Sequence, residues 1–567
     1  MDKKTIIRTL EKIALYMELQ GENPFKVSAF RKAAQVLELD ARSLAEMDNI
    51  LSLKGIGAAT GAVIKDLIDE GHSSLLIELQ KTVPSGLLPM LKIPGLGGKK
   101  IAKLYKELQI DSIDALKEAC VAKKVQTLEG FAAKTEEKIL AEIESFQSKP
   151  ERTAIWQLEP IVEMIRKKLL DISMIEKFSV AGSYRRVKEA SKDIDFIIAT
   201  SSPQEVREEL LKVLPIIKVI AAGDTKVSVT LDVENEVDVD FRLVEIHQYA
   251  SALNHFTGSK DHNIKMRQIA KDQGKKISEY GVELEDGTIQ HFESEYEFYN
   301  YFGLPFIPPT VREDGSELGT LDQLPFLVTL DDIKGDFHMH TTWSDGAHSI
   351  EEMVEACLAK GYSHMVISDH SDYLKVANGL SKERLLQQIE TIQELNAKYK
   401  DIEIFAGTEM DILPDGSLDF DDEVLKQLDF VIASIHSSFS QPQEKIMERL
   451  YNAIKNPYVH MIAHPTGRII EQREGYNPDV PELIKWAKEY GKILELNASP
   501  YRLDLKTEYL HLAKEASVPI AINTDAHHMD QLKYMDVGIR YAQKAWLHKE
   551  NVVNTWTLEK FKQFIMK

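Results

Sequence analysis

The sequence has almost no cysteine and no long apolar run. Only Cys120 and Cys357 occur among 567 residues, outside any CxxC pair, so neither a disulfide framework nor a cysteine-based zinc site is expected. No stretch approaches the roughly 18 uninterrupted apolar residues of a membrane span, and the charged N-terminus lacks a signal-peptide core. We therefore expect a cytoplasmic protein in which any metal ion is bound by His, Asp and Glu.

Basic residues are outnumbered in this chain. It holds 69 Lys and Arg against 90 Asp and Glu, a net charge of -21. This balance disfavours a protein that coats nucleic acid nonspecifically, because phosphate affinity comes from Lys and Arg. It is compatible with local basic surfaces and with carboxylate sites that bind divalent cations. The length predicts roughly three or four domains.

Residues 1–148 are expected to form short helices, and they contain an internal repeat. The segments 53–60 (LKGIGAAT) and 93–100 (IPGLGGKK) share a Gly-hydrophobic-Gly turn before a helical pattern, and 128–135 is a degenerate third copy. Such a turn brings backbone amides at a helix N-terminus within reach of a phosphate. One copy would be an ordinary helix turn, whereas two favour a helix-hairpin-helix contact with the DNA backbone. The candidate DNA-binding residues are Gly55, Gly57, Gly95, Gly97, Lys99 and Lys100.

The pattern changes twice further along the chain. Residues 149–315 mix helices with β-branched runs, as at 178–181, 196–199 and 226–230. A polar stretch with Pro and Gly follows, and it predicts a linker at 316–333. Over 334–567, strand-like segments that end in His or acidic residues alternate with helical patterns. This alternation favours an α/β barrel or layered domain with its chemistry at the strand ends.

The first candidate site is a cluster of carboxylates. Asp193 and Asp195 occupy alternate positions of a predicted strand and therefore share a face. Asp240 or Asp238 on a neighbouring strand would complete the cluster. Such a cluster requires divalent cations, and two Mg²⁺ ions suit in-line nucleotidyl transfer. Without the other motifs, the DxD pair would equally fit a solvated strand edge.

A second candidate site is rich in histidine. His338 and His340 project to the same side of a predicted strand and can bind one ion through neutral imidazoles. Similar residues follow later apolar runs: Asp369, His370, Glu409, His436, His464, Asp525 and His527. A single His after a strand is usually only hydrogen-bonded. Several such segments at one end of a barrel can instead hold two or three Mn²⁺, Zn²⁺ or Fe²⁺ ions, with a bridging water as nucleophile.

The motifs of the first site carry a family resemblance. GSYRR at 182–186, DID at 193–195, VDFRL at 239–243 and HFTGS at 255–259 resemble the core of family X DNA polymerases, the DNA polymerase beta type, over residues 1 to about 315. The resemblance implies that Asp193, Asp195 and Asp240 bind two Mg²⁺ ions, with Asp240 nearest the primer 3′-hydroxyl. It also implies nucleotide contacts from Gly182, Ser183, Arg186, Phe256, Gly258, Asn263 and Arg267.

Two positions depart from that family. His255 stands where relatives often place Tyr, which puts the strength of ribonucleotide exclusion in question. Val63 aligns with the Schiff-base Lys of relatives that excise deoxyribose phosphate. A lyase activity is therefore not expected, and it would need another amine such as that of Lys65.

The C-terminal motifs resemble a different family. HMH, SDG, SDH, GTE, SIH, AHP and TDAH are similar to the polymerase and histidinol phosphatase (PHP) family, whose fold is a distorted TIM-like barrel, across residues 334–567. The resemblance implies nine ligands for up to three Mn²⁺ or Zn²⁺ ions: His338, His340, Asp345, His370, Glu409, His436, His464, Asp525 and His527. None of the nine is missing, which favours an active phosphoesterase.

The order of the domains resembles that of bacterial family X polymerases. It implies a monomer that fills short gaps in DNA during base excision repair, using gapped or primed DNA and deoxynucleoside triphosphates. The PHP domain is then expected to be a 3′-to-5′ exonuclease, with abasic-site cleavage or 3′-end trimming as further activities. Two alternatives stay open: a polymerase fused to a phosphatase of the histidinol phosphate type, and a DNA-binding scaffold without catalysis.

Overall fold

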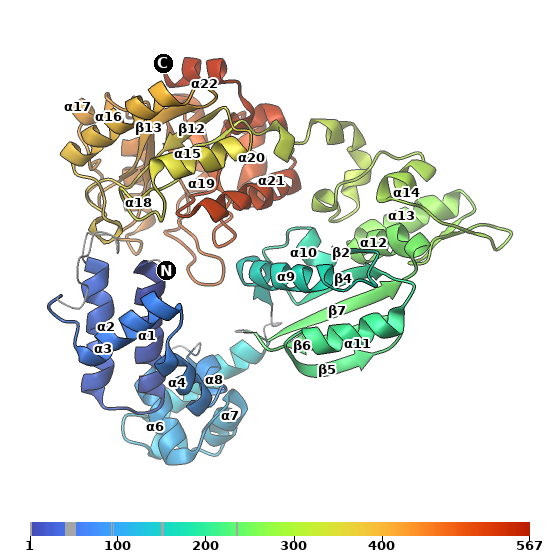
Figure 1. Cartoon of the computed structure of the whole chain (residues 1–567), viewed down its shortest axis with the longest axis horizontal. Helices are drawn as coiled ribbons and strands as arrows, with labels where there is room; N and C mark the ends of the chain where they lie inside the picture. The colour runs from blue at the N-terminus through green and yellow to red at the C-terminus, as the bar shows by residue number, and fades with distance from the viewer. Residues whose placement is uncertain are drawn as a thin grey trace. The chain divides into compact units, whose positions relative to one another are not determined.

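Figure 1 shows the computed structural model of the chain, which describes residues 3–39, 53–91, 93, 96–148, 152–233 and 236–566. The chain divides into two compact units. The first holds Met1–Pro150 with Lys375–Asn378, and the second holds Glu151–Leu374 with Gly379–Lys567. Among the described residues, no helix is long and apolar enough to cross a membrane.

The first unit is helical, as the sequence predicts. Its helices are α1 (Lys3–Leu19), α2 (Pro24–Leu39), α3 (Ala58–Glu70), α4 (Ser74–Thr82), α5 (Leu87–Met90), α6 (Gly98–Leu108), α7 (Ile113–Val121), η3 (Val125–Thr127) and α8 (Ala133–Ser148). Their apolar faces form one core, which includes Leu10, Phe30 and Ile101. Serine side chains at 73 and 112 accept hydrogen bonds from the first turns of α4 and α7, which fixes where these helices begin.

The second unit begins with a five-stranded sheet in the order β2-β4-β7-β6-β5. The strands are β2 (Lys177–Val180), β4 (Asp193–Ala199), β5 (Ile216–Ala222), β6 (Lys226–Leu231) and β7 (Val237–Val244), and the short pair β1 (Thr153–Ala154) and β3 (Ala190–Ser191) lies beside them. Helices α9 (Ile155–Leu170), α10 (Gly182–Arg185) and α11 (Pro203–Val213) complete this part. Along β7, Val237, Val239 and Phe241 are buried, so the intervening acidic residues point to the other face.

A small subdomain follows the sheet. It contains η4 (Ile246–Gln248), α12 (Tyr249–Thr257), α13 (Lys260–Asp272), β8 (Lys276–Ile277), β9 (Val282–Glu283), β10 (Ile289–Gln290) and α14 (Glu295–Tyr301). The predicted linker at 316–333 is more structured than its composition indicates. It forms η6 (Ser316–Gly319), η7 (Leu321–Phe326) and η8 (Leu330–Asp332), after η5 (Pro309–Val311). Leu324 and Leu327 are buried in the core of the subdomain, because apolar residues punctuate the polar stretch.

The C-terminal part is the predicted barrel. Seven parallel strands lie side by side in chain order: β11 (Gly335–Asp336), β12 (His364–Ile367), β13 (Glu403–Asp411), β14 (Phe430–Ser434), β15 (Met461–Ile462), β16 (Ile493–Asn497) and β17 (Ile520–Asn523). A parallel bridge between Met339 and Ala526 joins the first strand's continuation to the last, so the sheet nearly closes. Closure gathers the carboxyl ends of the strands at one rim.

Helices surround the strands of the barrel (Figure 1). They are α15 (Ile350–Ala359), α16 (Lys382–Lys398), α17 (Asp422–Leu425), α18 (Gln443–Ile454), α19 (Val480–Tyr490), α20 (Thr507–Ala516), α21 (Tyr534–Lys544) and α22 (Leu558–Ile565), with the 3₁₀ turns η9 (Lys375–Ala377), η10 (Met529–Lys533), η11 (Lys549–Asn551) and η12 (Val553–Thr555). The strands between them are buried along nearly their whole length, as expected for a parallel sheet that is covered by helices.

Candidate active sites

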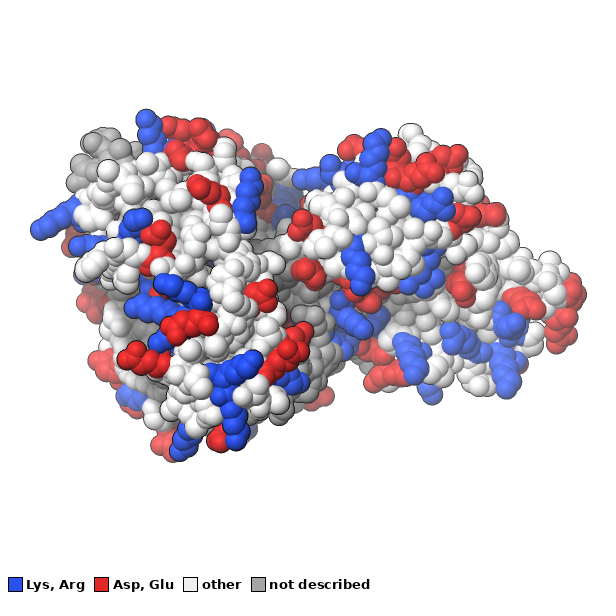
Figure 2. Space-filling view, turned by 90° about the horizontal axis from the view of Figure 1, so that it is seen from below, with Lys and Arg blue, Asp and Glu red and all other residues white. Residues whose placement is uncertain are grey.

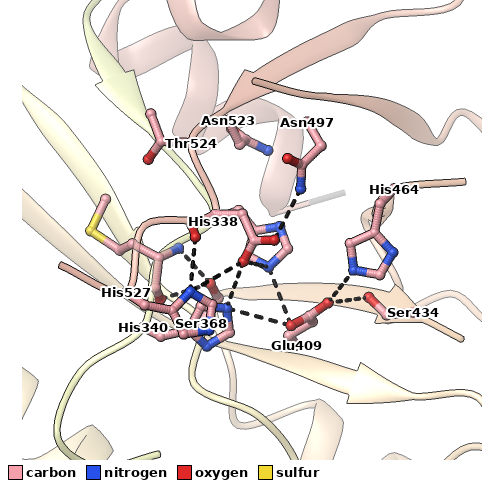
Figure 3. A network of polar contacts seen from close by, with 12 residues as sticks. His338, His340, Ser368, Glu409, Ser434, His464, Asn497, Asn523, Thr524 and His527 are labelled. Carbon is pink, nitrogen blue, oxygen red and sulfur yellow. Dashed lines mark hydrogen bonds and ion pairs between the residues drawn. The ribbon is translucent and has the colours of Figure 1, made fainter. Parts of the chain in front are cut away.

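Glu409 on β13 lies at the centre of the histidine-rich site. Its carboxylate contacts ring nitrogens of five histidines, three of which are labelled in Figure 3: His338 at 3.3 Å, His340 at 3.4 Å, His370 at 3.0 Å, His436 at 3.1 Å and His464 at 2.8 Å. These residues lie at or just beyond the ends of five strands, with His338 and His340 both following β11. The sequence therefore brings distant motifs together because each one is placed at a strand end.

The ligand atoms form three tight groups in the part of the chain that the structure describes. They are His340 with Asp345, His370 and His527; His338 with His340, Glu409 and Asp525; and His370 with Glu409 and His436. Within each group the atoms lie within 4.8 Å of one another. These groups contain eight of the nine predicted ligands, and the ninth, His464, contacts Glu409.

The buried histidines have ring nitrogens that make no hydrogen bond. They include Nε2 of His338, both nitrogens of His340, Nδ1 of His370 and Nδ1 of His464. Leaving buried polar atoms unsatisfied costs free energy, and a cation would use these lone pairs. Burial and the neighbouring His527 and His370 also lower the pKa of His340 to about 3, which keeps its imidazole neutral, as a ligand must be. The site therefore fits divalent metal ions.

Two of the predicted ligands have strained backbones. Asp525 has φ of 52° and His464 has φ of 26°, in the left-handed region that side chains other than glycine rarely adopt. Such conformations cost on the order of 1–3 kcal/mol each and are typical of functional sites. The Asn497 amide donates to the Asp525 carboxylate at 3.1 Å, which helps to hold that side chain toward the cluster.

A second layer of carboxylates, which the sequence analysis missed, orients the histidines. Glu495, in the middle of β16 and fully buried, lies 2.7 Å from Nδ1 of His338 and accepts from the Asn523 amide at 3.0 Å. Asp411 lies 3.1 Å from Nδ1 of His436. A carboxylate on one ring nitrogen fixes the tautomer and presents the other nitrogen to a metal ion. An acidic residue inside the apolar run ILELN was the available signal.

Replacing Glu495 with glutamine tests this second layer. The amide cannot fix the tautomer of His338 as the carboxylate does, so we expect the affinity for Mn²⁺ to fall by about 10- to 100-fold. Isothermal titration of the metal-free protein measures this change. The control is Glu482→Gln on α19, whose side chain is partly exposed and pairs with Lys485. Equal Mn²⁺ affinity in both variants would show that Glu495 does not position His338.

The aspartates of the first site face one another across neighbouring strands. β4 and β7 run parallel, so Asp195 is the register partner of Asp240, and Asp193 that of Asp238. The Asp240 carboxylate accepts from Ser228 Oγ at 2.6 Å and lies 2.7 Å from Lys226 Nζ. The candidates from different strands are thus placed together, although they do not form one of the tight ligand groups found among the described residues.

The carboxylates of this cluster are partly buried and repel one another, which raises the pKa of two of them. Burial and the neighbouring Asp193 and Asp240 raise the pKa of Asp195 to about 7, and burial and Asp240 also raise the pKa of Asp193. A divalent cation would relieve this cost. The cluster therefore fits metal binding for the same physical reason that its sequence pattern suggests.

The Gly-Ser turn lies directly beside these aspartates. Gly182 has φ of 63°, and a Cβ there would lie 2.1 Å from the Asp195 carboxylate, so only glycine fits. Ser183 Oγ donates to Ser191 at 2.8 Å. The Arg186 guanidinium donates to the carbonyl of Thr257 and lies 3.9 Å from Glu313. Gly182, Ser183 and Arg186 are thus adjacent to the carboxylates.

The other predicted nucleotide contacts lie on α12 and α13. Phe256 packs under the Arg242 guanidinium, 4.6 Å from ring centre to charge, and Gly258 ends α12 with φ of 67°. The Asn263 amide donates to the carbonyl of His255 at 2.8 Å. Arg267 lies on the same helix as Asn263, one turn further on. Phe256 thus packs against β7, and Asn263 contacts the end of α12.

The predicted DNA-binding residues lie at helix starts of the first unit. Gly57 and Gly97 are the residues that precede α3 and α6, and Lys99 and Lys100 are in the first turn of α6. Gly55 has φ of 120°, and a Cβ there would lie 2.8 Å from Val36. Gly95 lies outside the described residues. Figure 2 shows Lys and Arg interspersed with Asp and Glu on the face that it draws, so this face has no uniform charge.

Four family models match the chain. They are a helix-hairpin-helix domain at residues 1–73, a SAM-like helix-hairpin-helix tandem at 87–145, the DNA polymerase beta thumb at 252–313 and the PHP domain at 336–499. The first two fall on the helical unit, the third on the subdomain after the five-stranded sheet, and the fourth on the barrel.

Full-length and partial relatives are also known. The chain is 57% identical over 566 residues to the DNA polymerase/3′-5′ exonuclease PolX of Bacillus subtilis, covering 100% of this chain and 99% of that protein. It is 32% identical over 241 residues to a probable phosphatase of Caldanaerobacter subterraneus, covering 41% of this chain and 90% of that protein. A probable phosphatase of Acetivibrio thermocellus is 30% identical over 239 residues, covering 41% of this chain and 94% of that protein.

Proposed function

Because this chain belongs to the bacterial family X DNA polymerases that carry a C-terminal PHP domain, we propose that its two clusters are a polymerase site and an exonuclease site. The chain is a DNA-directed DNA polymerase with 3′-to-5′ exonuclease activity, and it fills short gaps in DNA. It binds DNA and uses divalent metal ions. The pairing of Asp195 with Asp240 beside the Gly-Ser turn is the observation that carries the first assignment.

In the proposed polymerase site, the primer 3′-hydroxyl attacks the α-phosphate of the incoming deoxynucleotide and pyrophosphate leaves. Asp193, Asp195 and Asp240 would bind two Mg²⁺ ions, which offset the charge of the phosphates. Backbone amides of the turn at 182–183 receive the triphosphate, and Arg186 adds positive charge. Phe256 and Gly258 line the sugar, while Asn263 and Arg267 contact the nascent base pair or the template.

In the proposed exonuclease site, the nine ligands would hold up to three ions of Mn²⁺ or Zn²⁺. Bound metal supplies an activated water as the nucleophile and stabilises the charge that develops on the phosphate. Glu409 contacts the five histidines around it, and Glu495 and Asp411 hold two of the rings in orientation. Cleavage at abasic sites and trimming of blocked 3′ ends remain predictions.

The helical unit would bind the DNA backbone without sequence specificity. Gly55, Gly57 and Gly97 would let the backbone approach a phosphate closely at the starts of two helices, and Lys99 and Lys100 would add charge. The same role for Gly95, the domain boundaries at 148, 315 and 333, a monomeric state and a cytoplasmic location remain predictions.

A gapped DNA with a 5′-labelled primer tests whether DNA is the substrate of both sites. We expect primer extension with Mg²⁺ and deoxynucleoside triphosphates, and primer shortening with Mn²⁺ when nucleotides are omitted. Histidinol phosphate, incubated with the same protein and Mn²⁺, serves as the comparison substrate, and no release of inorganic phosphate is expected. Phosphate release without any shortening of DNA would mean that the barrel is a small-molecule phosphatase.

A further inference from the structure

Helix α21 of the barrel contacts the turn that we assign to the triphosphate. Arg540 donates to the carbonyl of Arg185 at 3.0 Å, and Lys544, one helical turn further on, lies 3.4 Å from the carbonyl of Arg186. Residues four apart share a helix face, so both cations point at the same loop. These contacts go to main-chain oxygens of residues 185 and 186, and they therefore bear on the backbone conformation of the turn.

An ion pair fixes the other end of this loop. Arg468, 6% exposed, donates to both carboxylate oxygens of Glu189, at 3.1 and 2.9 Å, and the Tyr541 hydroxyl on α21 also donates to Glu189. Burial would raise the pKa of Glu189, but the hydrogen bonds and charge of Arg468 outweigh it and lower that pKa. Bidentate Arg–carboxylate pairs are among the geometrically most specific contacts in proteins.

Glu189 connects the turn to the catalytic strand. It lies three residues after Arg186 and directly before β3, which leads into β4 with Asp193. Its carbonyl accepts from the amide of Ile155 at 2.8 Å, and Lys188 donates its amide to the Ser183 carbonyl at 3.1 Å. A loop that is tied at 183, 185, 186 and 189 has little freedom to change shape.

Loops next to the proposed exonuclease site also contribute to the barrel side of the contact. Arg468 lies four residues after His464, and the carbonyl of Ile470 accepts from the Trp156 indole at 3.2 Å. Tyr501 stacks on Trp156 with ring centres 4.8 Å apart. The loops after β15 and β16 thus contact the metal cluster on one side and the five-stranded sheet's domain on the other.

We propose that the barrel positions the triphosphate-binding turn of the polymerase, through Arg468 and the α21 residues Arg540, Tyr541 and Lys544. This inference rests on the proposed role of residues 182–186 in binding the triphosphate. Arg468 and Tyr541 are positioning residues, because they act on the nucleotide only through Glu189 and the turn. Losing them displaces the backbone amides of the turn that bind the triphosphate. The affinity for the nucleotide therefore falls by a larger factor than kcat.

Steady-state insertion of one nucleotide into a one-nucleotide gap tests the inference on the full-length chain. Glu189→Gln and Arg468→Met are expected to raise KM for the deoxynucleotide by about tenfold, with kcat changed less than about twofold. Tyr541→Phe, which keeps the ring, is expected to raise KM by about two- to threefold. Glu482→Gln, which breaks an exposed pair elsewhere in the barrel, serves as the control and is expected to leave KM unchanged.

The double variant Glu189→Gln with Arg468→Met should have the same KM as the more impaired single variant, because both changes break the Arg468–Glu189 ion pair. Three outcomes would overturn the inference but not the proposed polymerase function. They are additive losses in the double variant, a fall in kcat at constant KM, and an unchanged KM in all three single variants. Absence of insertion by the unaltered chain would overturn the proposed polymerase function and the inference with it. If Arg468→Met proves unfolded in a thermal melt, Tyr541→Phe decides the question.

Discussion

Glu409→Gln is expected to abolish DNA shortening while primer extension continues. The Glu409 carboxylate contacts five histidine rings and belongs to two of the three ligand groups. An amide carries no charge to neutralise the cations that this site would hold, so the activated water would lose several kcal/mol of stabilisation. At about 1.4 kcal/mol for each factor of ten, we expect the exonuclease rate to fall by about 10³-fold or more.

The measurement uses 5′-labelled primer and Mn²⁺, and it follows shortening without nucleotides and extension with them. Glu403→Gln at the other end of β13 is the matched control, because Glu403 is only partly buried, pairs with Lys562 and lies far along the strand from the site. Normal shortening by Glu409→Gln would mean that a different part of the chain degrades DNA. Loss of extension as well would mean that the barrel's metal cluster also supports polymerisation.

Most of the barrel site was predictable because its signal is local. Each predicted ligand in the later motifs follows or lies in a short apolar run, and parallel strands with buried faces deliver their carboxyl ends to one rim. The expectation for His338 and His340 needs one adjustment: the regular strand β11 ends at Asp336, and both histidines lie beyond it. The bridge from Met339 to Ala526 holds them in place.

Contacts between distant segments could not be predicted in this way. Glu495 contacts His338, which is 157 residues away in the sequence, and Arg468 contacts Glu189, which is 279 residues away. No spacing rule connects such pairs, because closure of the barrel and its packing against the sheet bring them together. Composition also overstated the linker at 316–333, since its polar residues conceal the buried Leu324 and Leu327. Local patterns thus indicated the candidate ligands, whereas the residues that orient them required the tertiary structure.

Asp195→Asn is expected to remove primer extension and to leave DNA shortening intact. Asp195 lies between Gly182 and Asp240, at the point where the triphosphate turn meets the second carboxylate strand. Asparagine has nearly the same shape but carries no charge, so the packing against Gly182 is kept while cation binding is weakened. We expect the extension rate to fall by about 10³-fold, the effect of losing several kcal/mol of charge stabilisation.

The same gapped substrate measures the loss, with Asp238→Asn as the matched control. Asp238 lies on the same face of β7 but pairs in register with Asp193, accepts from Thr230 Oγ1 at 2.7 Å and is more exposed than Asp240. Because the sequence left Asp238 and Asp240 as alternatives, this comparison also separates them. An Asp238→Asn variant as inactive as Asp195→Asn would place Asp238 in the metal site, whereas near-normal extension leaves Asp240 as the third ligand.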